Sequence, residues 1–230
     1  MKWFKRLIHK IKNIFTKDDS DTDEMKTTVT LKERVSGACV ALGLMLGFFS
    51  INTETFSISS VMIGVVLFLV SGIIWWKSGL KLFSLKRIKL SSILFAIVIF
   101  FLIALIDRIL LAMLGTEGTA NDSAIDNVIQ MRSAIWLAIL GTFIGPIIEE
   151  VVYRGLGLKY IFKGLPWVGV IVLSTLFTMT HSPSSMIEFL IYFQSAVLFS
   201  VVYLKTKRLE LPIMMHVINN SSTFIPLLFQ

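Results

Sequence analysis

Long apolar segments recur through most of this sequence, and they constrain its fold more than any other feature. Seven can be drawn, at about 36–51, 58–76, 90–114, 133–156, 167–181, 187–204 and 211–229. Most approach the roughly 20 residues that a helix needs to cross a bilayer, although the first and fifth are short. A lone strand in lipid would leave its backbone groups unpaired. The sequence therefore predicts an all-α integral membrane protein, a polytopic helical bundle of about seven spans.

Composition agrees with this fold class and narrows the partners. Of the 230 residues, 55% are hydrophobic and 16% are charged, far from the average of soluble domains. The net charge of +7 does not indicate nucleic acid, because the Lys and Arg residues cluster beside apolar segments and form no continuous basic face; we interpret them as topology signals and contacts to anionic lipid. Cys39, the one cysteine, lies inside the first apolar segment, which excludes an intramolecular disulfide.

The chain divides into an arm, 1–35, and a transmembrane domain, 36–230. Residues 1–17 place apolar and basic residues at helical spacing, typical of a basic amphipathic helix on an anionic membrane surface. A signal peptide is the competing interpretation, but the segment has no unbroken apolar core and no small-residue cleavage site. Residues 18–24 are an acidic linker.

The distribution of basic residues predicts the orientation in a bacterial cell membrane. If the apolar segments alternate in direction, these residues gather on one side: the N-terminal arm, Lys77, Lys81, Lys86, Arg87, Lys89, Lys159, Lys163, Lys205, Lys207 and Arg208. The opposite connections are acidic, with Arg132 as their basic residue. By the positive-inside rule the N-terminus is cytoplasmic and the C-terminus lies outside.

Two adjacent glutamates, Glu149 and Glu150, interrupt the fourth apolar segment. An ionisable side chain within a membrane span is costly and usually marks a working site. Glu150 and Arg154 are four residues apart, so they share a helix face and are predicted to pair. Glu149 is rotated from Glu150 by about 100° and can face a different group. Pro146 is expected to kink this helix near the glutamates and loosen its packing.

Three more polar residues complete a candidate site: His181, His216 and Asn220. A buried carboxylate beside a second carboxylate suits a general base near neutral pH, so Glu149 could deprotonate a water that a histidine orients. His216 and Asn220, four apart on one face, could donate hydrogen bonds to an oxyanion. Gln194 and Ser195, in the sixth segment, are interpreted as helix-to-helix hydrogen-bonding residues.

These residues resemble those of the CPBP intramembrane proteases, also called Abi or CAAX-protease-like, which include CAAX prenyl endopeptidases and bacteriocin-processing or self-immunity proteins. The family pattern is Glu-Glu-x-x-x-Arg, Phe-x-x-x-His and His-x-x-x-Asn. This sequence has Glu149, Glu150 and Arg154, then Phe177 and His181, then His216 and Asn220. The resemblance covers about 133–229. It implies that Glu149 and His181 activate water, that His216 and Asn220 stabilise the oxyanion, and that Glu150, Arg154 and Phe177 support them.

The family has been described both as metalloproteases and as metal-free glutamate proteases. We expect no cofactor, because the sequence has no His-Glu-x-x-His run and no third membrane histidine. If zinc is used, its ligands would be Glu149, His181 and His216.

The predicted function is thus an intramembrane endopeptidase that cleaves a membrane-associated or lipidated polypeptide from the cytoplasmic side. One alternative is a non-catalytic bacteriocin self-immunity protein of the same family. Another is a proton-coupled transporter, although the chain lacks two matching interrupted segments.

The depths of the site residues do not all agree along the predicted segments. Glu149 lies about 10 Å from the cytoplasmic end of its segment and His216 about 7 Å from the start of the last one. His181 lies about 21 Å along the fifth segment. It is too deep unless that helix starts late, tilts or ends under a sunken loop.

Overall fold

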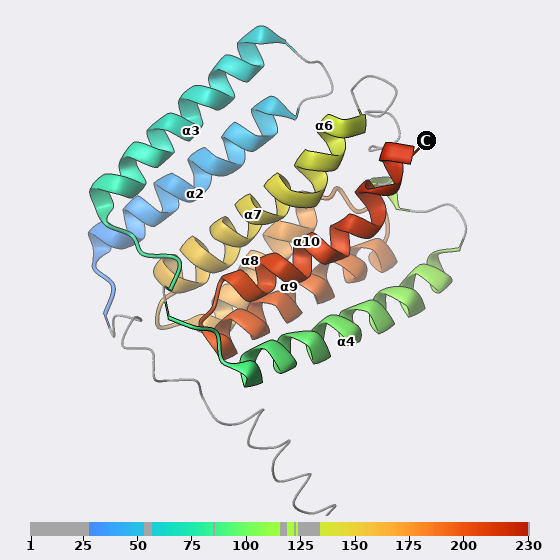
Figure 1. Ribbon diagram of the computed structural model, residues 1–230. Helices are drawn as coiled ribbons and strands as arrows, with labels where there is room; N and C mark the ends of the chain where they lie inside the picture. The colour runs from blue at the N-terminus through green and yellow to red at the C-terminus, as the bar shows by residue number, and fades with distance from the viewer. Residues whose placement is uncertain are drawn as a thin grey trace, which may run out of the picture.

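The protein is a bundle of helices, shown by a computed structural model that describes residues 28–52, 57–84, 86–115, 119–121, 123 and 134–229 (Figure 1). The helices are α2 (Leu31–Ile51), α3 (Ile58–Ser78), α4 (Leu90–Leu114), α6 (Ala134–Ile139), η1 (Leu140–Ile144), α7 (Gly145–Glu150), η2 (Val151–Ile161), α8 (Pro166–Met179), α9 (Met186–Thr206), α10 (Glu210–Phe224) and η3 (Pro226–Phe229). These ranges contain no strand, which confirms the all-α prediction. The predicted amphipathic helix, 1–17, and the acidic linker lie outside the described residues.

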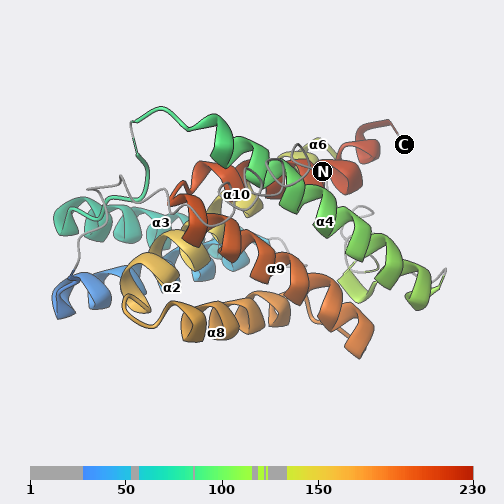
Figure 2. The same cartoon turned by 90° about the horizontal axis from the view of Figure 1, so that it is seen from below.

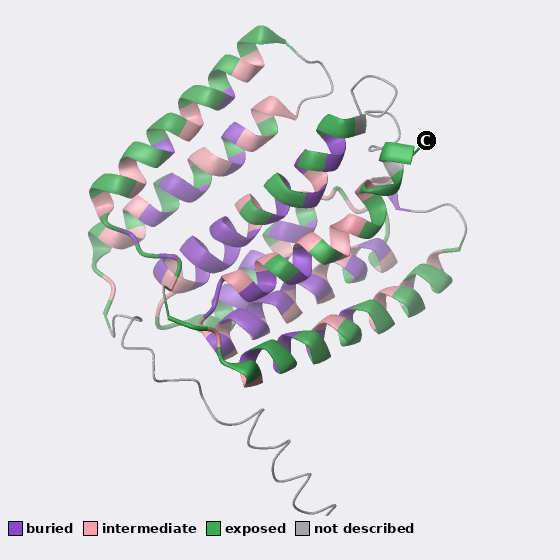
Figure 3. Cartoon of the chain, viewed as in Figure 1, coloured by how far each residue is buried: buried purple, intermediate pink, exposed green. Residues whose placement is uncertain are grey.

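Each of the seven predicted apolar segments is helical. Five helices within the described ranges are long and apolar enough to cross a membrane: α2, α3, α4, the continuous run from Ile135 to Ile161, and α9. The other two segments form shorter helices, α8 with 14 residues and α10 with 15. The outer faces of α3 and α4 expose large apolar side chains (Figure 3), among them Met62, Leu69 and Phe101. Such faces suit contact with lipid, as an integral membrane protein requires.

Local sequence signals fix where several helices begin. Thr30 caps α2 by accepting a hydrogen bond from the Glu33 amide, and the Glu33 carboxylate accepts one from the Thr30 amide in return. Ser57 and Ser60 make the corresponding exchange at α3. Capping satisfies amides that a helix terminus would otherwise leave unpaired.

Small residues let α2 and α3 approach closely. Gly43 and Gly47 of α2 are four apart and face Ser71 and Gly64 of α3; a Cβ at Gly47 would lie 3.2 Å from the Gly64 carbonyl oxygen. Helices in lipid gain little from apolar burial, so close backbone packing of this kind is a main source of their association. The α2/α3 pair lies along one side of the bundle, next to η2 (Figure 1).

The remaining helices surround the segment 134–161. α9 packs between α4 and α8, and α10 lies across α4, α9 and α7 (Figures 1 and 2). The main core forms where η2 meets α2, α8 and α9, around Leu156, Val170 and Tyr203. A second core lies between α4, α9 and α10, around Ile103, Phe199 and Met215.

Arginine side chains tie the helix ends that carry the basic residues. Arg34 donates to the carbonyl oxygens of Tyr160, Ile161 and Lys163 at 3.3, 2.5 and 2.8 Å, where η2 ends. Arg208 donates to the carbonyl oxygens of Lys86 at 2.6 Å and Ser84 at 3.3 Å, before α4 begins. Carbonyls at helix ends and in connections lack intrahelical donors, so these contacts satisfy them and close this end of the bundle.

Candidate active site

The two glutamates lie on a short α-helical turn between two π-helical stretches. η1 precedes α7 and η2 follows it. Pro146 has no amide hydrogen to donate, and the Gly145 amide bonds to Leu140, five residues back. At Pro146, where a kink was predicted, the helix is continuous, but its backbone hydrogen bonds change to the π pattern. π turns within helices frequently occur at functional sites.

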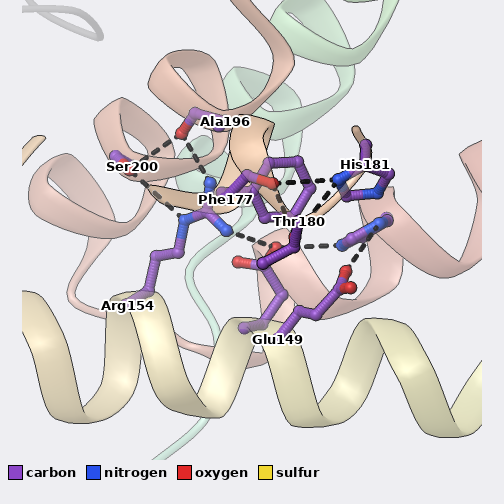
Figure 4. A network of polar contacts seen from close by, with 9 residues as sticks. Glu149, Arg154, Phe177, Thr180, His181, Ala196 and Ser200 are labelled. Carbon is purple, nitrogen blue, oxygen red and sulfur yellow. Dashed lines mark hydrogen bonds and ion pairs between the residues drawn. The ribbon is translucent and has the colours of Figure 1, made fainter. Parts of the chain in front are cut away.

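Glu150 and Arg154 form a buried ion pair, as the spacing predicts. Their side chains are 0% and 1% exposed, and Arg154 Nη1 lies 2.8 Å from Glu150 Oε1. Arg154 also donates to the Ala196 carbonyl at 2.6 Å and to the Ser200 hydroxyl at 3.3 Å (Figure 4). The Phe177 ring lies 5.3 Å from the guanidinium carbon. The pair is thus held by several partners, which a buried charge requires.

His216 lies between the two glutamates. Its Nδ1 is 3.0 Å from Glu150 Oε1, and its Nε2 is 3.6 Å from Glu149 Oε2. The Glu150 carboxylate is paired with Arg154, and an ionised carboxylate can only accept hydrogen bonds. Nδ1 is therefore the nitrogen that carries the proton and donates it. In a neutral ring Nε2 then has a lone pair facing Glu149. This pair of groups can hold one proton between them, directly or through a water.

His181 is held differently, in the turn that follows α8. Its Nδ1 lies 2.9 Å from the Phe177 carbonyl oxygen, an acceptor, so Nδ1 is the protonated nitrogen and Nε2 keeps its lone pair. The ring stacks on Tyr192 with centroids 4.4 Å apart and lies 4.7 Å from the Phe177 ring. These contacts fix the ring orientation.

Asn220, in the second half of α10, donates from Nδ2 to the Gly141 carbonyl at 3.0 Å. Each side-chain amide nitrogen has two hydrogens, so one donor stays available after this bond. The contact also ties α10 to η1, next to the glutamates.

A cavity of about 850 Å³ joins these residues. Glu149, His181 and Asn220 all line it, and Figure 4 shows Glu149 and His181 close together, each held by its own set of polar contacts. The further lining residues are Phe48, Phe49, Asn52, Ala104, Asp107, Arg108, Leu111, Thr119, Asn121, Leu137, Leu140, Gly141, Gly145, Pro146, Thr180, Ile191, Tyr192, Asn219, Ser222, Thr223 and Phe224. His216 is not among the lining residues, but its Nε2 lies 3.6 Å from Glu149 Oε2. The structure therefore brings the four predicted catalytic residues together, but both ring nitrogens of His216 face carboxylates.

The difference in depth narrows because the fourth span continues to Ile161, five residues beyond its predicted end. Glu149 is therefore twelve residues from the end of its helix rather than seven. At the start of α10, Leu209 and Leu211 are buried, and six residues into that helix the Nε2 of His216 lies 3.6 Å from Glu149 Oε2.

Tyr192 and Glu188 contribute to the site in ways that the sequence motifs do not indicate. The Tyr192 hydroxyl lies 3.0 Å from the Thr119 hydroxyl, so the ring that stacks on His181 is itself anchored. Glu188, 3% exposed, accepts from the amides of Ser184 and Ala120. The sequence signal available for Glu188 is its position three residues after the helix cap Ser185. Tyr192 has no comparable signal.

The predicted hydrogen bond from Gln194 to another helix is present. Gln194 Nε2 donates to Asp107 Oδ1 at 2.7 Å, from α9 to α4. It also donates to the Ser195 hydroxyl at 2.7 Å. Asp107 thereby has a fixed orientation at the cavity wall.

The candidate zinc ligands are not gathered as a metal site requires. Among the described residues no group of three His, Cys, Asp or Glu side chains is placed to hold a metal ion. The alternative set Glu149, His181 and His216 is thus not assembled. Both histidines use Nδ1 for protein contacts, which leaves Nε2 as the nitrogen that could bind a metal.

Comparison with known proteins agrees with the resemblance. Residues 131–222 match the family model described as Rce1-like, type II CAAX prenyl endopeptidase Rce1-like. The chain is 34% identical over 91 residues to the membrane-embedded CAAX protease MroQ of Staphylococcus aureus (strain USA300). That match covers 36% of this chain and 36% of MroQ, so it spans about a third of each protein. No solved structure matches the chain.

Proposed function

We propose, from the match of residues 131–222 to the family model of Rce1-like CAAX prenyl endopeptidases, that this chain is an intramembrane endopeptidase. Its substrate would be a membrane-associated or lipidated polypeptide. The observation that carries the proposal is that Glu149, His181 and Asn220 line one cavity, with His216 Nε2 3.6 Å from Glu149 Oε2. The family match includes all four residues.

In this proposal Glu149 is the general base. A water between the Glu149 carboxylate and the lone pair of His181 Nε2 loses a proton to Glu149 as its oxygen attacks the peptide carbonyl carbon. His216 Nε2, next to Glu149 Oε2, can take that proton because Glu150 holds Nδ1–H in place. The proton finally passes to the nitrogen of the leaving amine. Because water is the nucleophile, no covalent enzyme intermediate is formed.

Asn220 would stabilise the negative charge that develops on the carbonyl oxygen. Its bond to Gly141 fixes the amide, and its second N–H is available to donate. The family resemblance implies this role for His216 as well, but both of its ring nitrogens face carboxylates, so in this proposal it holds the proton taken from the water instead. Fixed donors aimed at a developing oxyanion are among the strongest contributions to catalysis.

The test is hydrolysis by the purified full-length chain in detergent. The probes are a quenched fluorescent peptide with a prenylated C-terminal cysteine motif and a pool of unmodified transmembrane peptides, with cleavage sites read by mass spectrometry. Glu149→Gln should abolish cleavage while the protein stays folded. Glu210→Gln is the matched control, because Glu210 is a carboxylate at the basic end that pairs with Arg208. Undiminished turnover by the folded Glu149→Gln variant would refute the proposed role of Glu149 as general base.

Metal dependence and the immunity role are tested separately. Exhaustive chelation should leave turnover unchanged; a loss that zinc restores would overturn the metal-free mechanism. In cells exposed to a bacteriocin-like peptide, protection that survives Glu149→Gln would favour the non-catalytic self-immunity function instead.

A further inference from the structure

The cavity lies entirely in one half of the bundle, as the position of its lining residues along each helix shows. It is lined by the last residues of α2, by the second half of α4 from Ala104 to Leu111, and by the second half of α10. On the fourth span it is lined from α6 to α7, and never from η2. It includes the turn after α8 and the first half of α9. Helices of alternating direction all contribute the same end.

That end is opposite to the end that carries the basic residues. Lys32 and Arg34 lie at the start of α2, Lys77 lies in the last turn of α3, and Lys159 and Lys205 lie near the ends of η2 and α9. The positive-inside rule assigns such an end to the cytoplasm. The cavity half has one basic residue among its lining residues, Arg108.

The basic end is also closed by protein contacts. Arg34 and Arg208 donate to backbone carbonyls there, and Tyr160 donates to the Lys81 carbonyl at 2.9 Å. Beneath them, the side chains of η2 from Val151 to Leu158 are all buried. A polypeptide entering from this end would have to displace the main core, whereas the cavity reaches the other end at Asn52 and Phe224.

The cavity wall near that end suits a polypeptide. It combines aromatic side chains, Phe48, Phe49 and Phe224, with the amides of Asn52 and Asn219. Amide side chains can bond to both the N–H and the C=O groups of an unfolded segment, and the rings can accept apolar side chains.

We propose that the cavity opens on the non-cytoplasmic face of the membrane and receives a peptide segment presented at that face, such as the juxtamembrane part of an exported polypeptide. The direction of opening follows from the charges and the cavity; the hydrolysis of the segment rests on the proposed function. This differs from the sequence-based expectation of cleavage from the cytoplasmic side, because hydropathy and charge do not indicate in which half of the bundle a cavity lies.

Single-cysteine labelling tests the direction without any need for activity. Cys39→Ser removes the one native thiol, and Thr223→Cys then places a thiol on the exposed wall of the cavity. Lys77→Cys places one at the exposed basic end and is the matched control. Intact cells expressing the full chain are treated with a charged, membrane-impermeant maleimide, with and without permeabilisation.

We expect Thr223→Cys to be labelled to the same extent with or without permeabilisation, and Lys77→Cys labelling to rise severalfold when the membrane is opened. The reverse pattern would overturn the proposal, as would equal labelling of both sites in intact cells. Adding Glu149→Gln should leave the pattern unchanged. An inactive protein with the expected labelling would therefore refute the proposed hydrolysis and leave the direction of opening intact.

Discussion

The two halves of the continuous helical segment 134–161 differ in what surrounds them: one half is packed against other helices, and the other half lines the cavity. In η2 the side chains from Val151 to Leu158 are buried against α2, α8 and α9. In η1 and α7, by contrast, Gly141, Gly145, Pro146 and Glu149 line the cavity. The change occurs between two adjacent glutamates. One end of this helix is thus packed within the core, and the other end carries the residues that are proposed to react.

Glu149 and Glu150 illustrate this division. Glu150 is 0% exposed and bonds to Arg154 and to His216, whereas the Glu149 side chain is 12% exposed and faces the cavity. Their shared neighbour is His216, which contacts both. The half that is packed therefore orients the half that is proposed to react, and substitutions in each half should change different measured quantities.

The largest effect on stability is expected from Arg154→Met. Removing one member of a buried ion pair leaves the other charge without a partner, which costs about 3–5 kcal/mol of unfolding free energy. The thermal midpoint of the purified protein in detergent should fall sharply. Arg87→Met, at an exposed arginine, is the control and should leave the midpoint nearly unchanged. Equal midpoints for the two variants would show that the buried pair does not stabilise the packed half.

Asn220→Ala should separate activity from stability in the cavity half. Loss of one oxyanion donor reduces turnover by about 10²-fold, while losing the bond to Gly141 costs about 1 kcal/mol of stability. The measurement is kcat on the cleavable peptide together with the thermal midpoint. Ser221→Ala, next to Asn220 on α10 but not among the cavity-lining residues, is the matched control. A similar loss of turnover in both variants would contradict a specific role for Asn220.

Much of this arrangement is predictable from the sequence, because helix existence depends on local hydropathy and i,i+4 spacing is fixed by helix geometry. All seven segments and the pairing of Glu150 with Arg154 are of this kind. The end of the fourth span could not be predicted in this way. Gly155, Gly157 and Lys159 lower the local hydropathy, yet the helix continues to Ile161 because protein, not lipid, surrounds it. Hydropathy measures suitability for lipid and cannot detect such burial.

Contacts between distant segments could not be predicted from the sequence either. The position of His216 between two carboxylates depends on the packing of α10 against α7, and the stacking of Tyr192 on His181 depends on the turn after α8. Neither follows from spacing within a helix. The same holds for the half of the bundle in which the cavity lies, which required the ends of all the helices to be placed.

Tyr192 offers a smaller, more selective test of the cavity half. Tyr192→Leu removes the ring that stacks on His181, an interaction of about 0.5–1.5 kcal/mol, so kcat should fall by up to roughly tenfold with little change in KM. Tyr192→Phe keeps the ring and loses only the hydroxyl contact to Thr119, and should recover most of the activity. A change in KM alone, or no recovery with Phe, would contradict a positioning role for the ring.

The smallest effect is expected at the opposite end of the molecule, from Arg34→Met. Arg34 donates to the carbonyls of Tyr160, Ile161 and Lys163, but its side chain is only partly buried, so water replaces much of what is lost. We expect about 1 kcal/mol of lost stability and unchanged kcat and KM. Lys32→Met controls for the loss of charge, because Lys32 lies two residues before Arg34 and does not make these carbonyl contacts. If Arg34→Met altered KM, the basic end would belong to the substrate path, and the division between a packed half and a reactive half would fail.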